Sequence, residues 1–179
     1  VAELASAELG VVDIVVCNFS LFADAPIADG DDESLSRIIS RKISLIEGIS
    51  EQLLPMMQSS PAGRIILLGF NRGVFAQDGM ESYAKAEAAI ADLTRHLAAE
   101  RAKYGINVNY IQPGAIMTPE SRRVFNNDKA LRDYCIQQSA AKRLGEPVDI
   151  AKVALFLATD DSVFVSGTGI VADGGIAAG

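Results

Sequence analysis

The sequence predicts a single α/β domain in which helices cover a doubly wound parallel sheet. Four short apolar runs are rich in Ile and Val and mostly continuous, which is typical of strands buried on both faces of a parallel sheet. Longer segments with helical spacing of apolar residues separate these runs, so strands alternate with helices along the chain. The chain has 179 residues, 49% of them hydrophobic, which is enough to bury one core, and we treat residues 1–179 as one domain.

The predicted strands are the apolar runs "VVDIVVC", "RIILLGF", "INVNYIQ" and "TGIVA", at residues 11–17, 64–70, 106–112 and 168–172. Ahead of the first run, "VAELASAELG" predicts the last turns of a helix that Gly10 closes. No helix start signal and no initiator methionine precede this segment. We therefore expect the natural chain to extend before Val1.

The predicted helices cover residues 34–57, 81–103 and 147–158. In the second helix, apolar residues recur on one face, and Gly105 stands just past the end, where glycine commonly closes a helix. The third begins with Pro147, and proline favours the first turn of a helix. If the strands pair in sequence order, right-handed crossovers place the connecting helices on one face. We therefore expect the other face to be poorly covered and the first strand to present an apolar edge.

Composition narrows the function classes. A net charge of −7 and a pI near 4.7 argue against a nucleic-acid surface. Cys17 and Cys135 have the spacing of neither a disulfide framework nor a metal site, which indicates reduced thiols in an intracellular, cytoplasmic protein that binds no metal. No apolar run approaches the roughly 18 residues of a membrane helix, so we expect no membrane partner.

Several segments together resemble the short-chain dehydrogenase/reductase family. "VDIVVCNFS" and "GRIILLGFNRG" are similar to its fourth strand and to its fifth strand with the following turn, and "YAKAE" occupies the place of its Tyr-x-x-x-Lys motif. "GINVNYIQPGAIMTP" and "KRLGEPVDIAKVALFLATDDSVFVSGTGIVADGG" are similar to its sixth strand, its Pro-Gly turn and its carboxyl-terminal third. The resemblance implies a Rossmann-like fold whose amino-terminal half, with the glycine-rich phosphate loop, is expected before Val1.

The resemblance also assigns catalytic positions. In the family, a tyrosine exchanges a proton with the substrate oxygen, a lysine four residues later lowers the tyrosine pKa, a serine binds the carbonyl oxygen and an asparagine organises a water relay. In this sequence the corresponding residues are, in that order, Tyr83, Glu87, Phe70 and Lys42. A carboxylate one helical turn from Tyr83 would raise the tyrosine pKa, and phenylalanine cannot hydrogen-bond an oxyanion. The alternative for Tyr83 is a tyrosine that only packs in the core.

Lys42 and Glu87 carry opposite charges, and in the family's geometry both positions face the inner end of the site. A lone buried charge costs several kcal/mol, so we expect the two side chains to form a charge-swapped pair that holds their helices together. The alternative is that Lys42 extends to solvent while Glu87 is protonated or hydrated.

NAD or NADP is the cofactor that the resemblance implies. Asn18 matches the second asparagine of the family's Asn-Asn-Ala-Gly segment, and the turn that meets the nicotinamide carboxamide is matched by Pro113, Gly114, Ile116 and Thr118. The segment "GTGIVA" at 167–172 fits G-x-G-x-x-A, but that fingerprint needs a strand before it and a helix after it, whereas this segment leads into the last predicted strand. Without a phosphate loop, we expect this chain alone to bind NAD or NADP no better than millimolar.

The leading interpretation is a family member of oxidoreductase ancestry with a degraded catalytic tetrad. It would act as a weakly active or inactive subunit of a homo- or hetero-oligomer, because in the family the helices equivalent to 34–57 and 81–103 build a subunit interface. The alternative is a working NAD(P)-dependent carbonyl reductase or alcohol dehydrogenase that uses Tyr83 with unusual partners. Residues 119–143 occupy the place of the family's substrate lid, and their sequence does not identify the small-molecule substrate.

Overall fold

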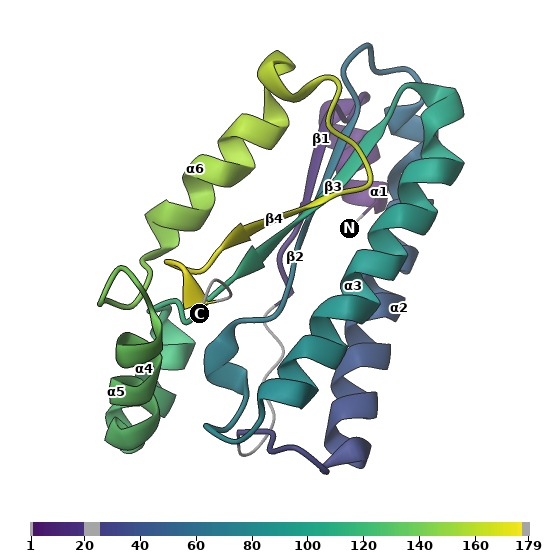
Figure 1. The fold of residues 1–179 in the computed structure, drawn as a ribbon. Helices are drawn as coiled ribbons and strands as arrows, with labels where there is room; N and C mark the ends of the chain where they lie inside the picture. The colour runs from purple at the N-terminus through teal and green to yellow at the C-terminus, as the bar shows by residue number, and fades with distance from the viewer. Residues whose placement is uncertain (1, 20–25, 177–179) are drawn as a thin grey trace.

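A computed structural model describes residues 2–19 and 26–176 of the chain (Figure 1). Four parallel strands form one sheet in the order β1-β2-β3-β4. Their bounds are Ile14–Cys17 for β1, Arg64–Leu68 for β2, Asn107–Pro113 for β3 and Gly169–Ala172 for β4. The predicted parallel α/β architecture is confirmed, and each predicted strand overlaps an observed one with ends that differ by a few residues.

The predicted helices are observed with ends that differ by a few residues, and the structure adds two helices that were not predicted from the sequence. The bounds of the predicted helices are Ala2–Leu9 for α1, Asp32–Met57 for α2, Met80–Arg101 for α3 and Pro147–Ala158 for α6, and those of the added helices are Pro119–Asn127 for α4 and Lys129–Gln138 for α5. The side chain of Asp31 caps α2 by accepting a hydrogen bond from the Ser34 backbone N–H. Gly10 and Gly105 have φ angles of 71° and 70°, the left-handed conformation in which glycine ends a helix without steric cost.

The helices lie on both faces of the sheet, with α2 and α3 side by side on one face and α6 on the other (Figure 1). On the α6 side, Leu157 packs with Ile66, Leu68 and Ile111 of the strands. The expectation that all connecting helices share one face is therefore wrong. The connection from β3 to β4 first passes through α4 and α5, and only then returns along the sheet as α6.

The first strand lies at the edge of the sheet, as the sequence predicts, and one of its faces is open. Val15 and Cys17 are buried beneath the helices, whereas Ile14 is 44% exposed and Val16 is 50% exposed. In β2, by contrast, every residue is buried, because α6 covers β2 on the face of the sheet that is exposed at β1. Burial on both faces explains why the β2 segment is continuously apolar.

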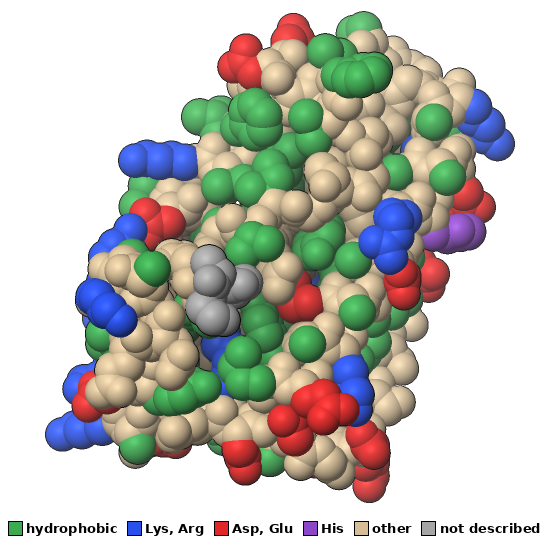
Figure 2. Space-filling model, in the orientation of Figure 1, with side chains coloured by type: hydrophobic (Ala, Val, Ile, Leu, Met, Phe, Trp, Pro, Cys, Tyr) green, Lys and Arg blue, Asp and Glu red, His purple; other side chains and the backbone are tan. Residues whose placement is uncertain are grey.

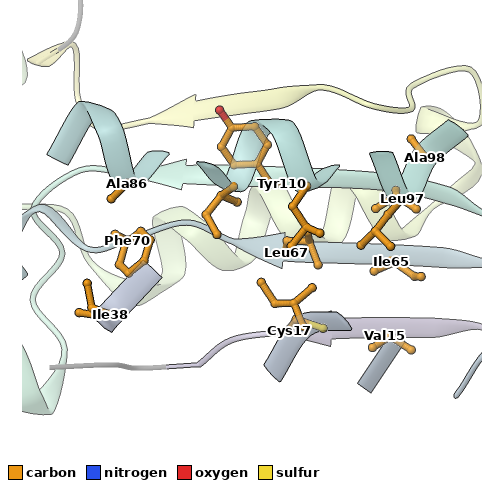
Figure 3. Close-up of a cluster of buried hydrophobic side chains, with 14 of the residues drawn as sticks. Val15, Cys17, Ile38, Ile65, Leu67, Phe70, Ala86, Leu97, Ala98 and Tyr110 are labelled. Atoms are coloured by element: carbon orange, nitrogen blue, oxygen red, sulfur yellow. The ribbon is translucent and has the colours of Figure 1, made fainter. Parts of the chain in front are cut away.

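The main core lies between the sheet and the two long helices. Figure 3 shows side chains of β1 and β2 meeting those of α2 and α3, among them Cys17, Leu67 and Leu97. Phe70, just after β2, belongs to the same cluster and lies close to Ile38 of α2 (Figure 3). The residue at the predicted serine position is therefore a core side chain as well as a neighbour of the site.

The surface carries charges of both signs. Acidic side chains gather where α2 and α3 begin, and hydrophobic side chains lie over α6 and β4 (Figure 2). Within residues 2–19 and 26–176, no helix combines the length and the hydropathy that a membrane span requires.

Candidate active site

A cavity of about 150 Å³ lies at the carboxyl ends of the strands. Ligand sites of open parallel sheets form at this edge, because the loops that follow neighbouring strands meet there. The loops after β1, β2 and β3 and the start of α6 contribute its walls, which consist of Asn18, Phe19, Lys42, Leu68, Gly69, Phe70, Asn71, Val74, Pro113, Ile116, Thr118, Pro147 and Ile150. The walls are mostly apolar, with polar groups at a few points.

The predicted cofactor residues converge on this cavity with one exception. Asn18, Pro113, Ile116 and Thr118 all line it. Gly114 is not among the lining residues. A Cβ atom at Gly114 would lie 2.7 Å from the backbone Cα of Asp173, so glycine there lets the turn after β3 pass close to the end of β4.

The predicted catalytic residues divide into two groups. Lys42 and Phe70 line the cavity, whereas Tyr83 and Glu87 are not among its lining residues and lie buried in α3. All these side chains are at least nine-tenths buried, with exposed fractions of 2% for Lys42 and 8% for Tyr83. The fold therefore brings the four predicted catalytic residues close together, but only Lys42 and Phe70 face the cavity.

A single peptide group joins Lys42 to Glu87. Lys42 Nζ donates a hydrogen bond to the carbonyl oxygen of Gly69 at 2.7 Å. The N–H of Phe70, on the other end of the same peptide unit, donates to Glu87 Oε1 at 2.5 Å. Among the described residues, Lys42 and Glu87 form no direct ion pair. The opposite charges thus hold the turn after β2 between α2 and α3, and the predicted pair is indirect.

Burial dominates the electrostatics of these two charges. It raises the pKa of Glu87 from 4.5 to about 7, although the Phe70 N–H and the Lys42 charge oppose that rise. Burial likewise lowers the pKa of Lys42 from 10.5 to about 8, against the opposing effects of Glu87 and Cys17. Glu87 Oε2 is buried and has no hydrogen-bond partner among the residues that the structure describes. A Cβ atom at Gly69 would lie 2.5 Å from that oxygen, so any larger residue at position 69 would have to displace the carboxylate.

The phenol of Tyr83 is committed to the backbone. Its O–H donates a hydrogen bond to the carbonyl oxygen of Pro113 at 2.8 Å. Its ring packs edge-on against Phe75, with 5.4 Å between the ring centroids. Burial raises the pKa of Tyr83 well above its ordinary value, and the Glu87 carboxylate raises it further. The direction is opposite to the one that proton exchange near neutral pH requires.

Phe70 forms an apolar wall where a hydrogen-bonding side chain was expected from the family pattern. The ring is 2% exposed and packs edge-on against Phe75 at 6.0 Å. Lys42 Nζ lies 4.6 Å from the centre of the Phe70 ring, within the range of a cation–π interaction. The side chain therefore faces the lysine ammonium and offers a substrate oxygen no donor.

Two polar residues after β2 have structural roles that the sequence did not reveal. Asn71 Oδ1 accepts hydrogen bonds from the N–H groups of Gly73 and Ile116, and Asn71 Nδ2 donates to the Ile116 carbonyl. Arg72 is 1% exposed and donates to the carbonyls of Phe75, Ala76 and Gln77. Asn71 thus ties the turn after β2 to the turn after β3. The only signal for this role was the position of a polar residue directly after a buried strand.

The described residues fit only the nicotinamide end of a dinucleotide. A cavity of about 150 Å³ accommodates one benzene-sized ring, and the residues after β1 and β3 that line it are those expected near nicotinamide. The segment "GTGIVA" leads into β4, as predicted. In residues 2–19 and 26–176, no G-x-G-x-x-G segment joins a strand to a helix, so this part of the chain offers no phosphate loop of that kind.

Comparison with known proteins identifies the family. Residues 1–177 match the family model described as Enoyl-(Acyl carrier protein) reductase. The chain is 36% identical to acetoacetyl-CoA reductase of Rhizobium meliloti, with 94% of this chain and 69% of that protein aligned. It is 32% identical to the 3-oxoacyl-[acyl-carrier-protein] reductase FabG of Escherichia coli, with 98% of this chain and 71% of that protein aligned. The chain belongs to the short-chain dehydrogenase/reductase family.

Solved structures agree with this short-chain dehydrogenase/reductase assignment. A gluconate 5-dehydrogenase from Burkholderia cenocepacia, crystallised with NADP and tartrate, superposes with a TM-score of 0.80 at 28% identity, over 99% of this chain and 69% of that one. A Thermus thermophilus protein gives a TM-score of 0.83 at 24% identity, over 99% of this chain and 74% of that one, which supports the fold alone. The Rossmann-like fold and the oxidoreductase ancestry expected from the sequence are confirmed.

Proposed function

We propose that this chain is a short-chain dehydrogenase/reductase homologue with a degraded catalytic tetrad, weakly active or inactive in hydride transfer. The observation that carries the proposal is the position of Tyr83, whose O–H donates to the Pro113 carbonyl and whose pKa is raised by burial and by Glu87. A proton donor in this role needs a pKa nearer neutrality and a free path to the substrate oxygen.

The residues at the other three catalytic positions also weaken hydride-transfer chemistry. General acid–base catalysis contributes about 10²–10⁴-fold to a rate, and that contribution requires a positioned group of suitable pKa. Glu87 supplies negative charge where the family has positive charge, and Phe70 supplies no donor for the carbonyl oxygen. Lys42 holds the Gly69 carbonyl, so it occupies the asparagine position in a different role.

Cofactor binding at the nicotinamide end remains compatible with the cavity. Asn18, Pro113, Ile116 and Thr118 would hold NAD or NADP there, which supplies a hydride donor or acceptor when bound. The cavity wall formed by Phe70 and Ile150 would exclude water from the ring. The family relationship and the NADP in the Burkholderia gluconate dehydrogenase crystal support this part of the proposal.

An oligomer built through α2 and α3 is part of the same proposal. α2 leaves Leu45 37% exposed, and Ile39 and Ile43 are only partly buried on the same helix. An inactive chain in such an assembly would support an active relative. Analytical ultracentrifugation tests the assembly, and a monomer at micromolar concentration would contradict it.

The decisive assay, made on the natural full-length protein, is oxidation of NADPH or NADH with acetoacetyl-CoA, the substrate named for one relative. We expect a kcat/KM at least about 100-fold below that of the Rhizobium meliloti enzyme, since the general acid is lost. Only the triple variant Lys42→Asn, Phe70→Ser, Glu87→Lys of the full-length protein should bring back measurable hydride transfer. The single variant Glu87→Lys is the control, because it sets two ammonium groups near one peptide and keeps Phe70.

The competing function is a working NAD(P)-dependent carbonyl reductase that uses Tyr83 with unusual partners. Its support is that two relatives, at 36% and 32% identity, are named as an acetoacetyl-CoA reductase and a 3-oxoacyl-[acyl-carrier-protein] reductase. Turnover by the unsubstituted chain within about tenfold of the relative, abolished by Tyr83→Phe, would establish this function and refute the degraded site.

A further inference from the structure

The cavity contains one amine in an otherwise neutral wall. Among the described residues that line it, Lys42 is the only one with a titratable side chain. Lys42 Nζ contacts the carbonyl oxygen of Gly69 at 2.7 Å, the carbonyl oxygen of Phe19 at 3.3 Å and the face of the Phe70 ring at 4.6 Å. These neighbours are two dipoles and an aromatic face, so the lysine lacks the carboxylate contact that usually holds a buried ammonium in its charged form.

The surroundings of Lys42 favour the neutral form of its amine. Glu87 of α3 acts on Lys42 across the Gly69–Phe70 peptide, and both Glu87 and Cys17 of β1 act to raise the pKa of Lys42. Burial outweighs both and lowers the pKa of Lys42 to about 8. At about pH 7 roughly a tenth of Lys42 is then the neutral amine, against about four in ten thousand for an exposed lysine. A desolvated lysine of this kind is a nucleophile toward carbonyl carbon.

We propose that Lys42 is a nucleophilic amine that forms an imine with a small aldehyde or ketone held in this cavity. The neutral Nζ attacks the carbonyl carbon, a C–N bond forms, and the C=O electron pair moves to oxygen, which takes up the proton that the attacking nitrogen releases. The resulting carbinolamine loses a proton from nitrogen and hydroxide from carbon as one water molecule, and C=N forms. No oxidant, reductant or further reactant is needed.

The cavity limits which carbonyl compounds can react. Its volume of about 150 Å³ corresponds to one benzene-sized molecule, so chains of about four to six heavy atoms fit. Leu68, Val74 and Ile150 form an apolar wall that suits an alkyl group. The ligand class is therefore a short, uncharged aliphatic aldehyde or ketone. The proposal does not depend on whether hydride transfer is lost, because it uses neither Tyr83 nor a dinucleotide.

The test is reductive trapping with butanal and sodium cyanoborohydride, followed by peptide mapping. Lys85 is the internal reference, because it is exposed on α3 and pairs with Glu81. At about pH 7, labelling of Lys42 should exceed labelling of Lys85 by at least about tenfold, which leaves a wide margin for restricted access. The α-amino group reacts as well and is read from a separate peptide.

Variants separate reactivity from folding. Lys42→Arg should remove the preferred label while the exposed lysines keep theirs, and Lys85→Arg should leave the Lys42 label unchanged. Glu87→Gln removes the charge that raises the Lys42 pKa, so the ratio of Lys42 to Lys85 labelling at about pH 7 should increase. Labelling of Lys42 at or below the level of Lys85 in the folded wild type would overturn the proposal. So would an unchanged ratio in folded Glu87→Gln.

Discussion

The substitution Glu87→Gln probes the buried carboxylate with the least change in shape. Glutamine resembles the protonated carboxyl group in size and can still accept the hydrogen bond from the Phe70 N–H. At a pH where folded Glu87 is already protonated, the substitution should therefore change the free energy of unfolding little. At higher pH the wild-type side chain must ionise inside the core, whereas glutamine cannot.

The magnitude follows from the pKa of Glu87, which is raised from 4.5 to about 7 in the folded protein. Between these values the unfolded chain has released a proton that the folded chain still holds. The stabilisation is thus fully present below about pH 4.5 and is lost as the pH rises through about 7. The loss amounts to about 3 kcal/mol at about pH 7.5 and to less than about 1 kcal/mol at about pH 5. We expect Glu87→Gln to be more stable than wild type by these amounts.

Urea unfolding followed by circular dichroism at the two pH values measures the effect as a shift in midpoint at constant m. Glu47→Gln is the matched control, because Glu47 is exposed on α2 and its replacement should change stability little at either pH. A Glu87→Gln variant less stable than wild type by more than about 1 kcal/mol at about pH 7.5 would refute the reasoning. It would show that the carboxylate stabilises the fold as the partner of Lys42.

Further substitutions test the neighbouring contacts. Between about pH 8 and 10.5, folded Lys42 has lost a proton that the unfolded chain keeps, so the stability of the wild type should rise with pH over this range. Lys42→Met should remove this pH dependence, which urea unfolding across the same range measures. Tyr83→Phe should lower the free energy of unfolding by about 1 kcal/mol without changing any residual NADPH oxidation, and a large loss of activity would contradict its structural role. Gly69→Ala should cost about 2 kcal/mol or more because its Cβ meets the carboxylate at 2.5 Å, and combining it with Glu87→Ala should recover most of the loss in the same assay. Asn71→Ala should cost about 1–3 kcal/mol in thermal unfolding, since it releases the hydrogen bonds between two turns; an unchanged melting temperature would show that they contribute nothing.

Much of the fold was predictable because it depends on local patterns. Continuous Ile- and Val-rich runs predict buried parallel strands, and apolar spacing with Pro147 and Gly105 at the ends predicts the helices. The cavity residues that follow β1 and β3 were predictable too, since the family pattern places them after strands whose carboxyl ends meet. The face covered by α6 was not predictable, because the connection from β3 to β4 departs from the crossover rule: it passes through α4 and α5 before α6 packs on the face opposite α2 and α3.

The sequence by itself determined which side-chain types occupy the positions near the site, and hence that Lys42, Phe70 and Glu87 differ from the family pattern. Only the tertiary structure decided how these side chains meet. A backbone peptide separates ammonium from carboxylate, and no spacing along the chain encodes a contact made through another segment's backbone. Burial then moves both pKa values toward neutrality, because desolvation depends on everything packed around a group and not on its neighbours in sequence.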